Sequence, residues 1–354
     1  MKKWMALLLG LVLTFGLAAC GEGGGEQSSD TPEDAYTELL FDADFSQGFN
    51  LYGADSRYHA SNTWAQLLLS DTDPFWKLGT WGNFVNYFLD RELTVVEDGV
   101  SYTYPARPLE PVTENGVTTI SNPTYTVKVD PESGWLSLKL DSSQEYGVTP
   151  SYTDHPRLSA PRKDGEAWPH LIIEENLADP TALVDMEEVV FTLDFQISEV
   201  ENLTGEDFNP DLHTAQITWF VSIACINPFS AFYNQYIWFG LPIYDFRSES
   251  LTTTETAHFD GGKEDSTGML IYSVPQTAYL EELPAVGERI RFSVDMMDYM
   301  ERAFERAQDL DLFTDCTLAD MRLINTNLGW EMPGTFDATF EIFDISIKYK
   351  PAEG

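Results

Sequence analysis

The amino-acid sequence predicts an all-β protein, an antiparallel β-sandwich with one packed α-helix near residues 295–312. Most of the chain after residue 38 alternates apolar and polar residues with a period of two, which is typical of half-buried strands. Turn residues separate these segments, and one stretch alone has helical spacing. Many short strands joined by turns, with few helices, favour two sheets packed face to face.

Period-two alternation is clearest in three segments. TYTVKVDPESGWLSLKL predicts a hairpin around the DPESG turn, with apolar residues of the two strands matched across it. In VVFTLDFQISEV and RIRFSV the alternation places one apolar set on the core face, namely Val189, Phe191, Leu193, Phe195 and Ile197 in the first and Ile290, Phe292 and Val294 in the second.

The predicted helix lies in VDMMDYMERAFERAQDLDL. Its apolar residues recur at helical spacing, with charged residues around them. Met297, Met300, Phe304, Ala307 and Leu310 form this stripe. A methionine-rich stripe is typical of a helix packed on a sheet, so we interpret it as structural and not as a ligand site.

The first twenty residues, MKKWMALLLGLVLTFGLAAC, have a basic start, an apolar run and a small-residue end. They predict a secretory signal peptide over residues 1–19, since the apolar run is too short and wrongly flanked to span a membrane. The sequence LAAC at its end resembles the lipobox of bacterial lipoproteins. The resemblance implies cleavage before Cys20 and attachment of lipid to that cysteine. An ordinary signal peptide with a chance cysteine is the alternative.

Residues 20–38 would then form a lipidated cysteine and a tether rich in Gly, Ser and acidic residues. Such a segment buries too little apolar surface to order itself. We expect one sandwich domain over residues 39–354, held outside the cytoplasmic membrane at the cell surface or the periplasmic face. Contact with the membrane is expected through the lipid alone.

The chain is strongly acidic, with 20 basic and 58 acidic residues and a formal net charge of −38. A field of this sign repels nucleic acid and anionic surfaces, so nucleic acid is excluded as a partner. Neutral glycans, or a ligand bridged by calcium, fit this charge better than anionic polysaccharides.

Two cysteines follow Cys20, namely Cys225 and Cys316. In an exported chain they could form one disulfide. Because Cys225 lies in the apolar run ITWFVSIACI, a buried free thiol is the expected state and the disulfide is the alternative.

Both ends of the predicted domain carry aromatic-rich segments, ELLFDADFSQGFNLYG at 38–53 and GTFDATFEIFDISIKYK at 334–350. With the alternation described above, they resemble the jelly-roll sandwiches of concanavalin-A-like lectins and glucanases. The resemblance implies that FDADFS and FEIFDISIKY lie side by side as first and last strands. Two-lobed solute-binding proteins, common among lipoproteins, need alternating strands and helices, which this chain lacks.

AWPHLIIEENL offers the first candidate binding site, because Trp168, His170 and Glu174 share one face of a predicted strand. An aromatic ring packs on the C–H face of a sugar, while carboxylate and imidazole bond its hydroxyls. An edge strand with a solvated face is the alternative. The other candidate glycan-binding residues are Asp194, Gln196, Tyr236, Trp238, Trp76 and Trp81. For the last four, the alternative is a core or anchoring role.

Catalytic patterns are weak. The Glu-x-Asp-x-x-Glu strand of glucanases with this fold is absent, and jelly-roll lyases are matched only in QIT and YNQ, with Thr218 where a histidine should stand. If the chain is an enzyme, His170, Glu174 and Asp194 are the acid–base candidates. Scattered histidines disfavour zinc. The segment HFDGGKEDSTG is either a solvated acidic turn or a calcium site formed by Asp260, Glu264 and Asp265.

These observations together predict a surface-anchored lipoprotein whose β-sandwich binds a carbohydrate. The first alternative is a glycoside hydrolase or lyase on the same scaffold. The second is an envelope or adhesion scaffold that binds protein, which would show an exposed apolar patch.

Overall fold

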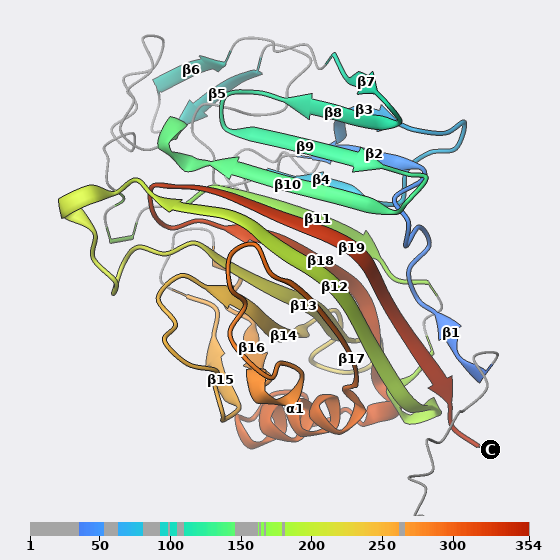
Figure 1. Ribbon diagram of the computed structural model, residues 1–354. Helices are drawn as coiled ribbons and strands as arrows, with labels where there is room; N and C mark the ends of the chain where they lie inside the picture. Colours follow the sequence, from blue (N-terminus) through green and yellow to red (C-terminus); the bar gives the residue numbers. More distant parts are fainter. Residues whose placement is uncertain are drawn as a thin grey trace, which may run out of the picture. The chain divides into compact units, whose positions relative to one another are not determined.

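Two packed β-sheets make up most of the computed structural model, which describes residues 35–52, 63–80, 93–97, 100–104, 110–145, 162, 164–165, 168–178, 181–261 and 266–353. We call the eight-stranded sheet the front sheet, after its place in Figure 1. In spatial order its strands are β17 (Arg289–Asp295), β12 (Met186–Asn202), β19 (Phe336–Pro351), β10 (Trp135–Asp141), β9 (Tyr125–Asp130), β8 (Val117–Ser121) and β7 (Val112–Glu114), with β1 (Thr37–Glu38) also paired to β19.

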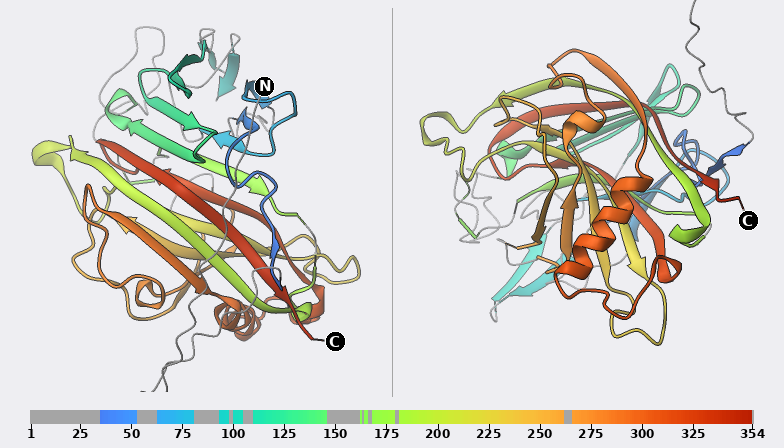
Figure 2. Two further views of the ribbon diagram at one scale, coloured as in Figure 1. Left: turned by 45° about the vertical axis from the view of Figure 1, so that its right-hand side comes forward. Right: turned by 90° about the horizontal axis from the view of Figure 1, so that it is seen from below.

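The nine-stranded sheet behind it is the back sheet (Figures 1 and 2). Its order is β15 (Thr256–Phe259), β16 (Leu270–Ser273), β14 (Tyr236–Asp245), β13 (Gln216–Cys225), β18 (Met321–Glu331), β11 (His170–Asn176), β4 (Lys77–Gly79), β2 (Gly48–Tyr52) and β3 (Thr63–Leu68). All its pairings are antiparallel except β14 with β16 and β2 with β4. A separate hairpin joins β5 (Leu93–Glu97) and β6 (Val100–Tyr104).

One α-helix, α1 (Met297–Asp309), occurs among the described residues, beside short 3-10 turns at Ser142–Gln144, Leu183–Asp185, Gly205–Asp207, Gln276–Ala278 and Leu318–Asp320. The predicted methionine stripe is its buried face, since Met297, Met300, Phe304 and Ala307 are all buried. In the part of the chain that the structure describes, no helix is long and apolar enough to cross a membrane.

The core lies between the two sheets and is built from the predicted alternation. The five apolar residues of VVFTLDFQISEV are fully buried in β12. Phe191 of the front sheet meets Trp219 of the back sheet edge-on, with ring centroids 4.9 Å apart. Trp330 of β18 donates from its indole nitrogen to the carbonyl oxygen of Leu138, 3.1 Å away in the other sheet. Such contacts join the sheets.

The fold prediction is confirmed: the described part of the chain is an antiparallel β-sandwich with one packed helix. The strands pass repeatedly from one sheet to the other, as in a jelly roll. The DPESG hairpin is present as β9 and β10, with Leu138 opposite Val127 and Leu140 opposite Tyr125.

The prediction for the opening segment is right in outline and wrong in detail. The strand beside β19 is β1, where Thr37 faces Tyr349, and so the end of the predicted tether is already part of the sheet. FDADFS is a turn and not a strand. The Asp42 carboxylate accepts from the backbone N–H groups of Ser46 and Gln47, which closes the turn, and β2 then enters the other sheet. The predicted signal peptide and Cys20 lie outside the described residues.

Candidate functional site

Polar and aromatic side chains gather on the outer face of the back sheet, the face turned away from the core. In β14 the buried residues Ile237 and Phe239 point into the core. Strand alternation therefore turns Tyr236 and Trp238 outward. The sequence left open which of these two sets faces the core, and the structure decides it.

An aromatic cluster of Phe220, Tyr236 and Trp238 stands on this face. The Tyr236 and Trp238 rings meet edge-on with centroids 4.9 Å apart, and Phe220 meets Trp238 at 5.6 Å. Each of the three is half-buried. Gly240 pairs with Phe220 across the sheet, and a Cβ at Gly240 would lie only 2.6 Å from the Phe220 ring. The missing side chain is what leaves room for that ring.

Trp238 is held by a loop that the sequence suggested as a calcium site. Its indole nitrogen donates to the Thr267 hydroxyl over 3.3 Å, and that hydroxyl donates to the Asp260 carboxylate over 2.7 Å. Asp260 therefore positions the aromatic cluster through Thr267. Glu264 and Asp265 lie outside the described residues. Among the residues that are described, no group of three potential ligands gathers to hold a metal.

A polar row runs across the strands next to the aromatic cluster. Strand register sets Phe220 beside Asn327, Asn327 beside Glu174, Glu174 beside Lys77, and Lys77 beside Asn50. The row crosses four strand spacings, or about 19 Å. At its centre the Lys77 ammonium and the Glu174 carboxylate form an ion pair at 2.8 Å.

In the predicted strand AWPHLIIEENL the polar residues point to the face that was expected, but the histidine is buried and not accessible to solvent. Leu171 is fully buried in the core, so His170 and Glu174 point to the outer face. His170 is itself only 3% exposed, with its Nε2 atom 3.9 Å from a carboxylate oxygen of Glu331. The Trp168 ring stacks on the His170 ring, with centroids 6.0 Å apart. The Arg162 guanidinium also lies over the Trp168 ring, 4.6 Å from its centroid. These groups form a packed end of the face.

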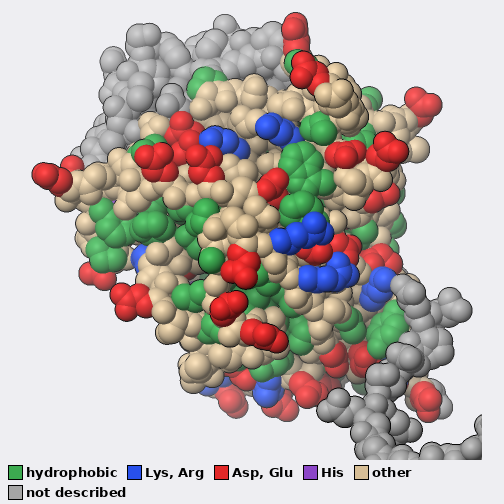
Figure 3. Space-filling view, in the orientation of Figure 1, with side chains coloured by type: hydrophobic (Ala, Val, Ile, Leu, Met, Phe, Trp, Pro, Cys, Tyr) green, Lys and Arg blue, Asp and Glu red, His purple; other side chains and the backbone are tan. Residues whose placement is uncertain are grey.

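The structure does not bring the three acid–base candidates together. Asp194 and Gln196 belong to β12 of the front sheet, where they face away from the core and so away from the back sheet. Asp194 accepts two hydrogen bonds from Arg289, at 2.6 and 2.9 Å, and these hold the pKa of its carboxyl below the ordinary value. It is a structural ion pair. Figure 3 shows Lys and Arg side chains among Asp and Glu on this front face.

Of the tryptophans near the amino end, Trp76 is a core anchor. It is fully buried, and its indole nitrogen donates to the carbonyl oxygen of Asp42 over 2.6 Å. The anchoring alternative is therefore correct for Trp76. Trp81 lies outside the described residues.

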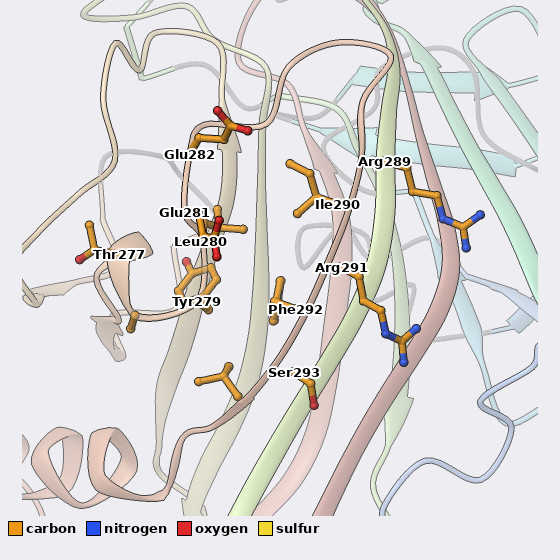
Figure 4. A pocket seen from close by; sticks show the side chains of 12 residues that line it. Thr277, Tyr279, Leu280, Glu281, Glu282, Arg289, Ile290, Arg291, Phe292 and Ser293 are labelled. Carbon is orange, nitrogen blue, oxygen red and sulfur yellow. The ribbon is translucent and has the colours of Figure 1, made fainter. Parts of the chain in front are cut away.

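A cavity of about 590 Å³ lies elsewhere, between β17 and the segment 277–282 (Figure 4). Ile290 and Phe292 point toward it, whereas the Arg289 and Arg291 side chains point to the opposite side. None of the predicted site residues within the described ranges lines it.

The sequence matches no protein-family model and no curated protein sequence. Solved structures similar to it include a cellulase derived from the Rhodothermus marinus enzyme, with 14% identity, a TM-score of 0.37, and coverage of 73% of this chain and 98% of that one. A family 12 xyloglucanase from Bacillus licheniformis has 10% identity, a TM-score of 0.38 and coverage of 69% and 97%. These identities and scores are too low to carry a conclusion about activity.

Proposed function

We propose that the outer face of the back sheet binds a linear, neutral glycan that lies across the strands. The aromatic cluster beside the polar row is the observation that carries this proposal. Aromatic rings pack against the C–H faces of sugars, and amide and charged side chains bond the hydroxyls around the ring edge. The cluster and the row supply both kinds of contact, one next to the other.

Neutral glycans fit the electrostatics of this face. Glu174 and Lys77 form an ion pair, so the centre of the row carries little net charge. The chain as a whole has a formal net charge of −38, which disfavours an anionic polysaccharide. Within the described residues, the Asn325 side-chain oxygen is buried and accepts no hydrogen bond. Register places Asn325 beside Ser222, and Ser222 beside Trp238, so this polar group lies two strands away from Trp238 of the aromatic cluster.

Cleavage of the same glycan is the second candidate function, because a carboxylate, Glu174, stands in the middle of the row. Hydrolysis by two carboxylates needs them about 5 Å or roughly 6.5–9.5 Å apart. Among the described residues of this face, Glu331 is four positions along β18 from Asn327, the neighbour of Glu174. That spacing is about 13 Å. Glu331 is therefore too far away to act together with Glu174.

Replacement of Trp238 by alanine is expected to weaken glycan binding about tenfold, since a sugar-packing ring contributes on the order of 1 kcal/mol or more. Binding would be measured by affinity electrophoresis through gels that contain neutral plant, fungal or host polysaccharides. Trp135→Ala is the matched control, because Trp135 is a half-buried tryptophan on the outer side of the front sheet. Asp194→Ala on that sheet should also leave binding unchanged.

Equal loss in the Trp238 and Trp135 variants would refute the proposed face. Retardation by no neutral glycan would leave a protein partner as the better hypothesis. Release of reducing ends from a retarding glycan, abolished in Glu174→Gln, would establish the enzyme reading instead.

We also propose that the chain is a lipoprotein held outside the cytoplasmic membrane, on the strength of the basic start, apolar run and LAAC sequence. In the native host, Cys20→Ser is expected to move the protein from the membrane fraction to the soluble fraction. Fractionation followed by immunoblotting measures this. A variant that stays membrane-bound would contradict anchoring at Cys20.

A further inference from the structure

Two thiols meet where the back sheet adjoins the segment after α1. Cys225 is the last residue of β13, and Cys316 lies between α1 and β18. Both side chains are buried, and their sulfur atoms are 3.1 Å apart. Apart from Cys20 in the leader region, the chain has no other cysteine, so neither thiol has a competing partner within residues 36–354.

The backbone on both sides of this contact is fixed by hydrogen bonds. The Gln308 side-chain amide of α1 donates to the carbonyl oxygen of Cys316 over 3.2 Å. Across from it, the backbone N–H of Cys225 donates to the carbonyl oxygen of Gln235 over 2.9 Å. Hydrogen bonds to two separate elements therefore fix the backbone of each cysteine, and this backbone position brings the two thiols together.

Polar contacts tie the same two segments together. The Asp315 carboxylate accepts from the Ser230 hydroxyl at 2.7 Å and from the backbone N–H of Ala231 at 2.9 Å. The Ser230 hydroxyl is also 3.1 Å from the Cys316 sulfur. A covalent link at this point would join two segments that already contact one another through these hydrogen bonds.

We propose that Cys225 and Cys316 form a disulfide in the exported protein. The partner is an oxidised disulfide carrier: one cysteine thiolate attacks the carrier disulfide and releases a carrier thiolate. The second cysteine then displaces the remaining carrier sulfur. Two protein thiols become one disulfide, the carrier gains the two electrons, and the two protons end on its thiols. This proposal does not depend on the glycan proposal.

The timing of this reaction follows from burial. Desolvation raises the pKa of the Cys316 thiol to about 12, so the folded protein holds almost no reactive thiolate there. Exchange is therefore expected while the chain folds, before packing buries the pair. Once formed, the disulfide would be equally shielded from reductants.

The link would restrain the connection between β13 and β14, residues 226–235. This segment exposes Phe229, at 94% of its surface, and Tyr233, at 48%. It leads directly into Tyr236 of the aromatic cluster. A disulfide at its base would hold the approach to the cluster in one place.

Non-reducing peptide mapping tests the proposal on the full chain, exported by a bacterial host or refolded with reduced and oxidised glutathione. After denaturation and alkylation without reductant, a single cross-linked peptide containing both cysteines is expected, lighter than its two parts by two hydrogens. Quantitative alkylation of both Cys225 and Cys316 in either preparation would overturn it.

Reduction supplies a second readout that needs no variant to fold. The disulfide closes residues 91 apart in sequence. Its reduction is therefore expected to raise the unfolding equilibrium constant roughly thirtyfold or more. The paired variant Cys225→Ser/Cys316→Ser, where it folds, should not respond to reductant. A wild-type unfolding curve that reductant leaves unchanged would also contradict the proposal.

Discussion

Replacement of Gly329 by alanine is expected to lower the free energy of unfolding by about 3 kcal/mol or more. Gly329 has a φ of +152° in β18, where it pairs with Ile172 of β11. A Cβ at this position would lie 2.2 Å from the carbonyl oxygen of Leu171 and 2.8 Å from the Ile172 Cα. The neighbouring backbone cannot move away without breaking the pairing of two central strands.

Urea denaturation followed by tryptophan fluorescence would measure this loss. Gly116→Ala is the matched control, because Gly116 also has a positive φ, +87°, but a Cβ there has no atom of the described residues within 4 Å. Only backbone strain applies, so a loss of about 1 kcal/mol is expected. Similar losses in the two variants would show that the close approach of β11 to Gly329 is not what fixes the residue as glycine.

A second large effect is expected from Glu175, a fully buried carboxyl on the core side of β11. It accepts a 2.9 Å hydrogen bond from the backbone N–H of Phe41, while its second oxygen has no hydrogen-bond partner among the residues that the structure describes. Desolvation raises its pKa from an ordinary value of 4.5 to about 8. The group is therefore protonated in the folded protein at a pH where it ionises in the unfolded chain.

The pH dependence follows from this difference. Below about pH 4.5 Glu175 is protonated in both the folded and the unfolded protein, so its titration does not reduce the free energy of unfolding. Between 4.5 and about 8 the unfolded chain binds fewer protons, so stability falls by up to about 1.4 kcal/mol for each pH unit. Above pH 8 the loss is complete.

Glu175→Gln isolates this contribution, because the amide oxygen still accepts from Phe41 and no proton is involved. Urea midpoints measured from pH 4.5 to 8.5 should diverge, with the variant the more stable at the alkaline end. Other carboxylates, such as Asp194, titrate alike in both proteins and cancel in the difference. Parallel midpoints across this range would show that Glu175 has no raised pKa.

The sequence predicts strands well here because burial on one face leaves a period-two pattern, as in β12 and in the β9–β10 hairpin. It predicts α1 for the same reason, with a helical period. It fails at FDADFS, where a carboxylate that caps a turn, Asp42, has the same spacing as a polar residue in a strand.

The proposed binding face is predicted less completely. Alternation limits Trp238 and Glu174 to one of two faces, and both lie on the outer face of the back sheet. Phe220, Asn327 and Lys77 could not be placed from the sequence, because their position beside these residues depends on the register between strands far apart in sequence. Asp194 was misplaced for the same reason: alternation assigns a face within one strand but not the sheet to which the strand belongs.

The short strand β1 has a consequence for chain order. Thr37 and Glu38 pair with Tyr349 and Lys348, so the start and finish of the described sandwich meet on one strand, β19. A peptide bridge between these ends, with a new opening at the exposed Asn115–Gly116 turn, would leave every strand pair in place. We therefore expect a circularly permuted chain to keep the same fold, because the stability of the sandwich depends on which strands pair and not on where the chain begins.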